Sequence, residues 1–256
     1  MVEIGRNDAA TVLALYRGSD ARFPLVGTVL LGEQDGVVYV DDPRRPRCAY
    51  VEHAFGFAQI LGEADAAFDA SLERHLIVER SFAAPKIRLY TPRMPPFLDD
   101  PRHAGMRSLR QRFVMGAGTS EREAMMDGCV AAPVDAGSVA AADRAFGVVT
   151  RFWRSAADFV AKAHAILVTR GGEPASICYA AAVVDGEAEI DVATRPEHQR
   201  LGLGRIAAEA FVRHCRERGL QPLWDCFANN AGSMQLSRAA GFTPKGAPYP
   251  FFTINR

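Results

Sequence analysis

The segment at residues 189–205, EIDVATRPEHQRLGLGR, limits the fold of this chain more than any other stretch. Polar and apolar residues alternate through its first part, which predicts a strand over residues 187–194. After a short loop, Gly202 opens a run with apolar residues at helical spacing, and Gly219 stops it. This pattern predicts a helix over residues 202–218. A strand that leads directly into a helix indicates a mixed α/β fold.

The loop between these two elements has the composition of a phosphate-binding turn. Backbone N–H groups of residues 199–204 would stand at the helix N-terminus, where they and the helix dipole suit a diphosphate. Gly202 and Gly204 have no Cβ, so phosphate oxygens can approach the backbone closely. Arg200 and Arg205 could add positive charge or could remain solvated. A Gly-x-Gly sequence alone is also compatible with an ordinary tight turn.

The residues around this segment predict the rest of a second α/β half. Asp185 and Gly186 stand between two expected strands and are a hairpin signal. Ser155, three residues before Asp158, is an expected helix N-cap. The expected strands are residues 129–134, 165–169, 176–184, 187–194, 223–227 and 251–254, and the expected helices are residues 138–146, 202–218 and 233–240.

The first half predicts a second compact α/β unit. A proline-rich loop is expected over residues 91–105. The expected strands are residues 25–31, 37–41, 48–53, 55–61 and 86–90, and the expected helices are residues 8–17 and 64–79. A chain of 256 residues is long enough for two domains, which we place at residues 1–116 and 117–256.

Composition excludes several classes of protein. Lys and Arg number 30, as do Asp and Glu, and there is no basic tract, so no nucleic-acid partner is expected. The chain has no apolar run of membrane-spanning length, and its first residues lack the pattern of a secretory signal, so we expect a cytoplasmic protein without a membrane partner. The five cysteines include no CxxC pair, and the six histidines form no ligand pattern. Reduced thiols and no metal site are therefore expected.

Two sequence motifs carry a resemblance to a known family. Residues 199–204, QRLGLG, resemble motif A of the GNAT N-acetyltransferases, Gln/Arg-x-x-Gly-x-Gly/Ala, with Pro196 at the usual offset. Residues 230–242, NAGSMQLSRAAGF, resemble the second motif of that family, which has Asn, a small residue, Leu and then Gly-Phe. Because both motifs occur, and at the separation found in the family, we do not expect the match to the GNAT family to be due to chance.

The resemblance extends over most of the chain. Residues 152–160, FWRSAADFV, and residues 38–64 are similar to the GNAT branch that contains the zwittermicin A resistance acetyltransferase. The resemblance implies a GNAT fold in the C-terminal half and a GNAT-like domain in the N-terminal half. Residues 1–120 contain no second motif A, so the N-terminal domain is expected to lack a cofactor loop.

The same resemblance implies acetyl-CoA as the cosubstrate, bound where the strand at residues 187–194 separates from the strand at residues 223–227. Backbone groups on the first strand would bind the pantetheine arm as an added strand would, and one N–H would polarise the acetyl carbonyl. The matching positions are Val192, Ala193, Thr194, Gln199, Arg200, Leu201, Gly202, Leu203, Gly204, Arg205, Asn230 and Ser233. Asn230 could also cap the helix that follows it.

Two carboxylates are candidates for the group that takes the proton of the attacking amine. Glu189 is the first choice and Asp191 the second, since both lie on one face of the same strand. Each could instead be solvated or salt-bridged, Asp191 with an arginine such as Arg195. Many GNAT enzymes donate the final proton from a tyrosine at the position of Ser237. Tyr249, Ser237 or water would have to replace it here.

Two neighbouring residues on the strand at 223–227 are assigned to packing. Trp224 is expected in the core or in a pocket wall, because indoles usually serve packing. Cys226 is not expected to be a nucleophile, because no histidine or acid partner is evident.

The sequence therefore predicts transfer of an acetyl group from acetyl-CoA to a primary amine of a small molecule, by direct attack. A non-catalytic acyl-CoA-binding regulatory module and a protein acetyltransferase remain as alternatives. A monomer or a homodimer is expected.

Overall fold

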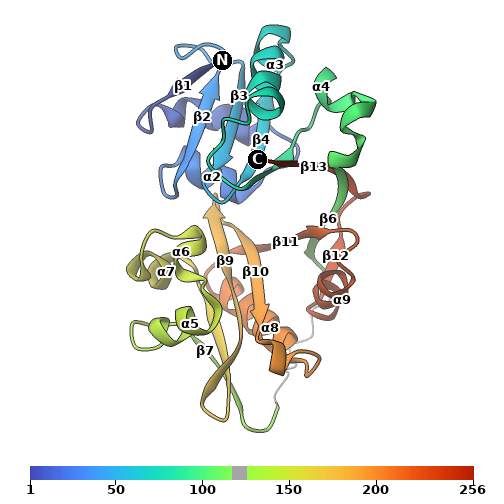
Figure 1. Ribbon diagram of the computed structural model, residues 1–256. Coiled ribbons are helices and arrows are strands. Elements are labelled where there is room, and N and C mark those ends of the chain that lie inside the picture. The colour runs from blue at the N-terminus through green and yellow to red at the C-terminus, as the bar shows by residue number, and fades with distance from the viewer. Residues whose placement is uncertain (117–125) are drawn as a thin grey trace. The chain divides into compact units, whose positions relative to one another are not determined.

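The computed structural model describes residues 1–116 and 126–256 (Figure 1). The first residues of the predicted second domain, 117–125, lie outside this range. The chain divides into two compact units, Met1–Arg110 together with Tyr249–Arg256, and Gln111–Pro248. The division differs from the predicted one at the C-terminus, because the last segment belongs to the first unit. That return is a pairing between residues far apart in sequence, which local patterns do not report.

The first unit, which we call the N-terminal unit, is built on a mixed sheet in the order β1-β2-β3-β4-β5-β13-β6. Every described pairing in it is antiparallel except that of β4 with β5. The core between this sheet and its helices contains Tyr50, Ile60, Leu72, Ile87 and Phe252. The strands are β1 (Val2–Ile4), β2 (Gly36–Val40), β3 (Cys48–His53), β4 (Phe57–Gly62), β5 (Lys86–Tyr90), β6 (Arg107–Met115) and β13 (Tyr249–Asn255). The division between the units falls within β6, whose residues 111–115 belong to the second unit.

One predicted strand of this unit is wrong. Residues 25–31 belong to a helix, α2 (Pro24–Leu30), in which all residues are buried. A short apolar run buried on every side shows no period, so it does not distinguish a strand from a helix. Pro24 at the first helical position was the local signal of a helix start.

The other helices of the N-terminal unit are more broken than predicted. The predicted helix at 8–17 is a 3₁₀ turn, η1 (Ala9–Val12), followed by α1 (Leu13–Arg17). The predicted helix at 64–79 is α3 (Ala66–Glu73) followed by a π-helical turn, η2 (Arg74–Val78). The predicted loop at 91–105 contains α4 (Pro96–Asp99) and most of η3 (Pro101–Met106).

The second unit, which we call the C-terminal unit, carries a sheet in the order β11-β10-β9-β8-β7. All described pairings are antiparallel except that of β10 with β11. The short β12 (Phe242–Pro244) pairs with the end of β6. The other strands are β7 (Cys129–Pro133), β8 (Ile166–Arg170), β9 (Glu173–Val184), β10 (Glu187–Thr194) and β11 (Gln221–Phe227).

The hairpin between β9 and β10 confirms the turn predicted from Asp-Gly. Asp185 has φ of 49° and Gly186 has φ of 80°, and positive φ at both central residues is the geometry of a type I′ turn. Farther along, Glu189 pairs with Ala182 but Ile190 pairs with Ala180. Ala181 is therefore the extra residue of a β-bulge on β9.

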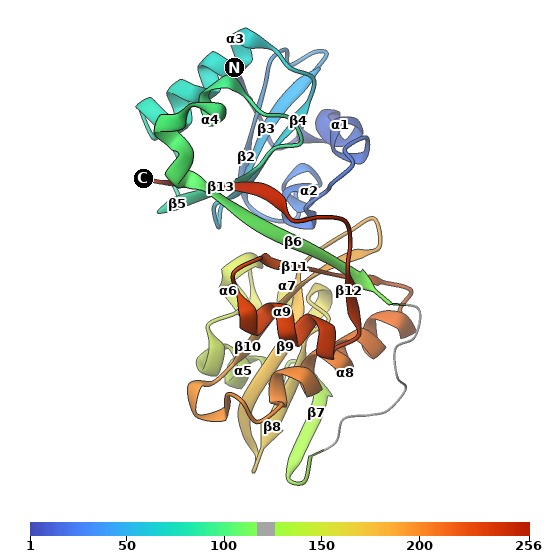
Figure 2. The same ribbon diagram turned by 90° about the vertical axis from the view of Figure 1, so that its right-hand side faces the viewer.

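Helices cover both faces of this sheet. Figures 1 and 2 show α8 on one side of β9 and β10, with α5, α6 and α7 on the other. The predicted inward face of α8 is confirmed, since Leu203, Ile206, Ala207, Ala210, Phe211 and Cys215 are all buried in one core cluster. The helices are α5 (Val139–Phe146), α6 (Val149–Phe152), α7 (Ala156–Lys162), the 3₁₀ turn η4 (Pro196–His198), α8 (Leu203–Glu217) and α9 (Ala231–Ala239).

The predicted N-cap of α7 is confirmed, because the Ser155 side chain accepts a hydrogen bond from the backbone N–H of Asp158 at 3.1 Å. Within residues 1–116 and 126–256, no helix is long and apolar enough to cross a bilayer. The same residues contain no group of three or more His, Cys, Asp or Glu placed to hold a metal ion.

Candidate functional site

The site is built where β10 and β11 separate. These two strands pair at Glu187 with Gln221, Ala188 with Pro222 and Glu189 with Leu223, and the described pairing ends there. Both strands continue for several residues beyond it. We call the side of β10 at residues 190–194 that faces away from β9 the open edge. An unpaired strand edge offers its N–H and C=O groups to an extended ligand.

The backbone direction along β10 follows from one hydrogen bond. Arg195 N–H donates to Ala175 O of the β9 side at 3.1 Å. Because backbone groups alternate along a strand, those of Ala193 and Asp191 also face β9. The N–H groups of Val192 and Thr194 therefore face the open edge, where the sequence analysis expected cosubstrate contacts.

The backbone N–H groups where the loop meets α8 have no hydrogen-bond acceptor among the described residues of the protein. In the described part of the chain, the N–H groups of residues 200–204 donate to no protein acceptor. Gly202 is the N-cap of α8, with φ of 82°, and provides no capping side chain. Arg200 also has positive φ, 60°. Consecutive unpaired N–H groups at a helix N-terminus form a site for an anion such as a diphosphate.

The two glycines of the loop serve different purposes. A Cβ on Gly202 would meet no atom within 4 Å, so this residue faces open space in a conformation that favours glycine. A Cβ on Gly204 would lie 3.1 Å from Thr194 Oγ1 and 3.5 Å from Leu236 Cδ2. Gly204 thus lets α8 pack closely against β10 and α9, whereas Gly202 leaves space for a ligand.

The side chains of Gln199 and Arg205 have protein partners of their own. Gln199 Nε2 donates to Thr194 O at 3.4 Å, which ties the loop to the end of β10. Arg205 pairs with Glu209 at 2.6 Å, one helical turn later. Arg200 and Leu201 are exposed beside the free N–H groups. Arg200 is therefore better placed than Arg205 to give an unshared positive charge to an anion.

The second motif builds the wall next to this loop. Asn230 is the N-cap of α9, as predicted, and accepts from Ser233 N–H at 3.1 Å. Ser233 Oγ accepts from the indole N–H of Trp224 at 3.1 Å. Trp224 is buried and its ring centroid lies 5.5 Å from that of Phe242, which confirms its place in the core. Ser233 thus orients Trp224 in addition to its predicted place at the cosubstrate.

The two candidate acids lie on the face of β10 away from α8. Ala188, Ile190 and Val192 pack into the core cluster that α8 fills, so alternation directs Glu189 and Asp191 to the opposite face. Glu189 is buried and belongs to the last pair with β11. Asp191 lies beyond that pair, on the part of β10 that has separated.

Three donors surround the Asp191 carboxylate. Tyr179 OH and Arg151 Nη1 donate to Oδ2 at 2.5 and 3.1 Å, and Val192 N–H donates to Oδ1 at 3.0 Å. Burial raises the pKa of Tyr179 far above its usual range, and the Asp191 charge raises it further, so the phenol stays protonated. The alternative that Asp191 is salt-bridged with an arginine is confirmed. The arginine is Arg151 and not the suggested Arg195, which pairs with Glu197 at 2.5 Å.

Arg151 and Tyr179 were missed by the sequence analysis. Arg151 lies in α6, and Tyr179 is an aromatic residue within an apolar strand, which reads as packing. Only the β9–β10 register, with Tyr179 opposite Asp191, brings the hydroxyl to the carboxylate. A buried tyrosine normally has a partner for its hydroxyl, and this was the signal available in the sequence.

The candidate proton donors are placed as follows. Ser237 is buried, and its hydroxyl donates to Met234 O of its own helix at 3.0 Å. Tyr249 lies in β13 of the N-terminal unit, where its ring centroid is 5.2 Å from that of Tyr90 and 6.2 Å from that of Phe23.

All five cysteines are free thiols, and four of them are buried. Burial raises the pKa of Cys48 and of Cys215 to about 12 and raises the pKa of Cys178 well above its usual value. These three thiols are therefore protonated at neutral pH and are poor nucleophiles.

An open strand edge beside a glycine-capped helix is the arrangement that the two sequence motifs predicted. The family model described as GNAT acetyltransferase matches residues 23–252. The chain belongs to this family. The match covers most of both units, in agreement with the mixed α/β fold expected for them.

Sequence relatives and a solved structure agree with this assignment. The chain is 33% identical over 91 residues to an uncharacterized N-acetyltransferase YdfB of Bacillus subtilis, covering 36% of this chain and 35% of that protein. It is 32% identical over 76 residues to the ribosomal protein bS18-alanine N-acetyltransferase of Escherichia coli, covering 29% of this chain and 51% of that enzyme.

The solved structure is a GCN5-related N-acetyltransferase-like protein of Streptococcus suis. It matches with a TM-score of 0.72 at 18% identity, covering 98% of this chain and 100% of that one. At this identity the likeness shows the fold, and it extends over the whole chain.

Proposed function

We propose that this enzyme transfers the acetyl group of acetyl-CoA to a primary amine of a small molecule, by direct attack of the amine. The observation that carries the proposal is the run of free N–H groups at residues 200–204, next to the open edge of β10. The open space at Gly202 suits the diphosphate of CoA, and the open edge suits its pantetheine arm. The residues present thus fit this cosubstrate.

Bound acetyl-CoA supplies an acetyl group activated as a thioester. The N–H of Val192 or Thr194 on the open edge donates to the acetyl carbonyl oxygen as negative charge develops there. Glu189, directly or through water, takes a proton from the acceptor ammonium. The amine nitrogen then bonds to the acetyl carbon and the carbon–sulfur bond breaks. The second proton that the nitrogen loses as it becomes an amide passes through water to the thiolate of CoA.

The class of acceptor rests on resemblance. The likeness of residues 152–160 and 38–64 to the zwittermicin A resistance branch supports a small amino-bearing molecule as the acceptor. The relative that acetylates the alanine of a ribosomal protein supports a protein N-terminus as the second candidate. Ser237 stands where many GNAT enzymes have the tyrosine that donates the final proton, and its hydroxyl is bonded to its own helix. This supports a third candidate, a non-catalytic acyl-CoA-binding module. The free thiols agree with a reducing compartment, and we propose the cytoplasm.

Two measurements separate these candidates. Calorimetric titration of the chain with acetyl-CoA tests the cosubstrate, and we expect saturable binding. Release of free thiol from acetyl-CoA is then followed with a panel of amino sugars, polyamines, amino acids and a peptide that begins with alanine. Turnover with a small amine supports the proposal, turnover with the peptide alone supports the protein substrate, and binding without any turnover supports the regulatory module. Absence of binding would remove all three.

A further inference from the structure

The Asp191 carboxylate occupies a backbone donor of the open edge. Its Oδ1 accepts from Val192 N–H at 3.0 Å, and this N–H is one of the two that face away from β9. An aspartate that bonds the N–H of the next residue must fold its side chain back along the strand. Within the proposed function, the same N–H is a donor for the acetyl carbonyl. One donor therefore has two acceptors that compete for it.

The two oxygens of this carboxylate have separate partners. Tyr179 OH and Arg151 Nη1 both donate to Oδ2, at 2.5 and 3.1 Å. Tyr179 is completely buried, and the Arg151 and Asp191 side chains are about one third exposed. Oδ2 is thus anchored from α6 and β9, while Oδ1 rests on the open edge. Release of Val192 N–H therefore requires Oδ1 to move away from the open edge.

We propose that Asp191 is a positioning residue and not the proton acceptor: Arg151 and Tyr179 hold its carboxylate on Val192 N–H, and the acetyl carbonyl takes over this donor when acetyl-CoA binds. The inference rests on the proposed function. It assigns proton removal to Glu189, which lies outside this set of bonds. The Asp191 carboxylate keeps the donor oriented and satisfied until the acetyl group arrives, since an unsatisfied N–H beside a partly buried strand is costly.

The inference predicts how the acetyl group contributes to affinity. In the wild-type protein the acetyl carbonyl gains a hydrogen bond to Val192 only by breaking the bond of Asp191, so acetyl-CoA gains little over CoA. CoA has no acetyl carbonyl and does not need the exchange. Removal of the carboxylate frees Val192 N–H, and the acetyl group then gains the full bond. A hydrogen bond to a charged acceptor is the stronger of the two, so its loss offsets most of what the acetyl carbonyl and the other contacts of the acetyl group contribute in the wild type.

The test is the ratio of the CoA dissociation constant to that of acetyl-CoA, measured by calorimetry. We expect Asp191→Ala to raise this ratio about 10-fold over wild type. Tyr179→Phe loosens the carboxylate without removing it and should raise the ratio by a smaller factor. A ratio unchanged in both variants, with acetyl-CoA still bound, would overturn the inference and leave the proposed function in place.

The control variant is Tyr50→Phe. Tyr50 is also completely buried, and its hydroxyl donates to the Glu52 carboxylate at 2.9 Å, but it lies in the N-terminal unit. It should lower the stability much as Tyr179→Phe does and leave the ratio at the wild-type value. A shifted ratio in Tyr50→Phe would show that lost stability, and not the release of Val192, changes the affinity.

A second readout needs no cosubstrate. The Val192 N–H of the free protein should exchange with solvent deuterium more slowly in the wild type than in Asp191→Ala, because the carboxylate is its acceptor. Equal exchange rates in the two proteins would contradict the hydrogen bond on which the inference depends. The rate provides a third check. If Asp191→Asn reproduces the pH-dependent loss of kcat/KM expected for a missing base, Asp191 is the proton acceptor and the inference fails.

Discussion

The two units of this chain share one arrangement of strands. In the C-terminal unit β8, β9 and β10 are successive antiparallel neighbours, and β10 then pairs with β11 in parallel at three positions. In the N-terminal unit β2, β3 and β4 are successive antiparallel neighbours, and β4 pairs with β5 in parallel, also at three positions. In the C-terminal unit both strands continue beyond this pairing, whereas in the N-terminal unit only β4 continues, because β5 ends at Tyr90. The topology that opens a strand edge is therefore present twice.

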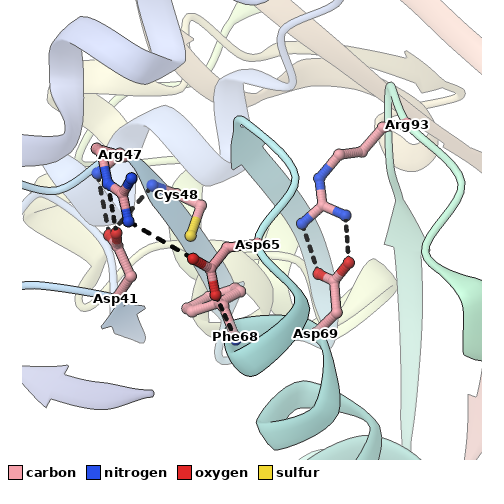
Figure 3. A network of polar contacts seen from close by, with 7 residues as sticks. All are labelled: Asp41, Arg47, Cys48, Asp65, Phe68, Asp69 and Arg93. Atoms are coloured by element: carbon pink, nitrogen blue, oxygen red, sulfur yellow. Dashed lines mark hydrogen bonds and ion pairs between the residues drawn. The ribbon is translucent and has the colours of Figure 1, made fainter.

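The helix that follows the separating strand differs between the units. In the N-terminal unit α3 begins at Asp65, whose carboxylate accepts from Phe68 N–H at 2.8 Å (Figure 3). Arg47 pairs with this Asp65 at 3.5 Å, and Arg93 binds Asp69 of the same helix with two hydrogen bonds of 2.6 and 2.7 Å. In the C-terminal unit α8 begins at Gly202, with no capping side chain.

The comparison teaches that the strand arrangement alone does not define a cosubstrate site. A carboxylate already satisfies the N-terminus of α3, and it would repel a diphosphate. The N-terminus of α8 has free N–H groups and space. The acids differ as well, since the third position of the parallel pairing is Gln59 in β4 and Glu189 in β10. Each difference suggests a substitution that makes one unit resemble the other.

The largest effect is expected from Glu189→Gln, which gives β10 the residue that β4 has at this position. An aliphatic ammonium has an ordinary pKa near 10.4, so few acceptor molecules are neutral at pH 7 without a base. We expect kcat/KM at pH 7 to fall about 10²-fold, and the deficit to shrink as pH rises. The measurement is a pH–rate profile from pH 6 to 10. A profile that overlays that of the wild type would remove Glu189 from the mechanism.

A second difference concerns acid stability. His53 is buried in the N-terminal unit, where its Nδ1 accepts from Phe55 N–H and its Nε2 lies 3.0 Å from Gln34 Oε1. Burial lowers the pKa of His53 from 6.5 to about 4. The unfolded chain therefore binds more protons between these pH values. The contribution of neutral His53 to the free energy of unfolding is therefore fully present above pH 6.5. This free energy should fall by about 2 to 3 kcal/mol as the pH drops to 4.

His53→Asn, which cannot titrate, should flatten this dependence in urea unfolding at pH 7, 5.5 and 4. His103→Asn in the same unit serves as the control and should keep the slope. Both tryptophans of the chain, Trp153 and Trp224, belong to the C-terminal unit. Circular dichroism should therefore report acid loss of the N-terminal unit before tryptophan fluorescence changes. A simultaneous change of both signals would show that the units do not differ in acid stability.

Gly202→Asp gives α8 the N-cap of α3, and Gly202→Val places branched carbons in the same space. Both variants should weaken acetyl-CoA binding by at least about 2 kcal/mol, because several N–H contacts to the diphosphate are lost together. Gly172→Val is the matched control, since Gly172 has φ of 86° and also faces open space, but in the β8–β9 turn. It should carry the same backbone strain and bind acetyl-CoA as the wild type does. If the wild type and all three variants bound acetyl-CoA with equal affinity, the loop would be an ordinary turn and not a diphosphate site.

The smallest effect is expected from Asp65→Ala, which removes the cap of α3. The free energy of unfolding should fall by about 1 kcal/mol, and acetyl-CoA affinity should not change. Calorimetry should give one acetyl-CoA per chain both before and after the substitution. A second equivalent of acetyl-CoA bound to the wild type would break the comparison, since it would mean that the N-terminal unit also binds cosubstrate.

Local signals predicted the elements of the C-terminal unit well. The Asp185-Gly186 turn, the Ser155 and Asn230 caps and the buried face of α8 each depend on residues close together in sequence. The strand predicted at residues 25–31 failed because a fully buried apolar run shows no period.

The contacts of the site that were not predicted from the sequence join residues that are far apart in the chain. The hydrogen bond of Tyr179 to Asp191 depends on the register between two strands, shifted by the bulge at Ala181. Arg151 reaches Asp191 from α6, 40 residues earlier in the chain. The difference between Gly202 and Gly204 depends on what lies next to each glycine, since their sequence context is nearly the same. Contacts of this type follow from tertiary structure and not from spacing.

The return of β13 to the N-terminal unit sets an order of events during synthesis. Phe251, Phe252 and Ile254 are completely buried, and β13 pairs with both β5 and β6. Until these residues leave the ribosome, the N-terminal unit exposes an apolar face and two unpaired strand edges. The residues of the C-terminal unit are all translated before β13, so the unit that is begun first on the ribosome is completed last. During that interval the nascent chain has a surface that a chaperone would bind.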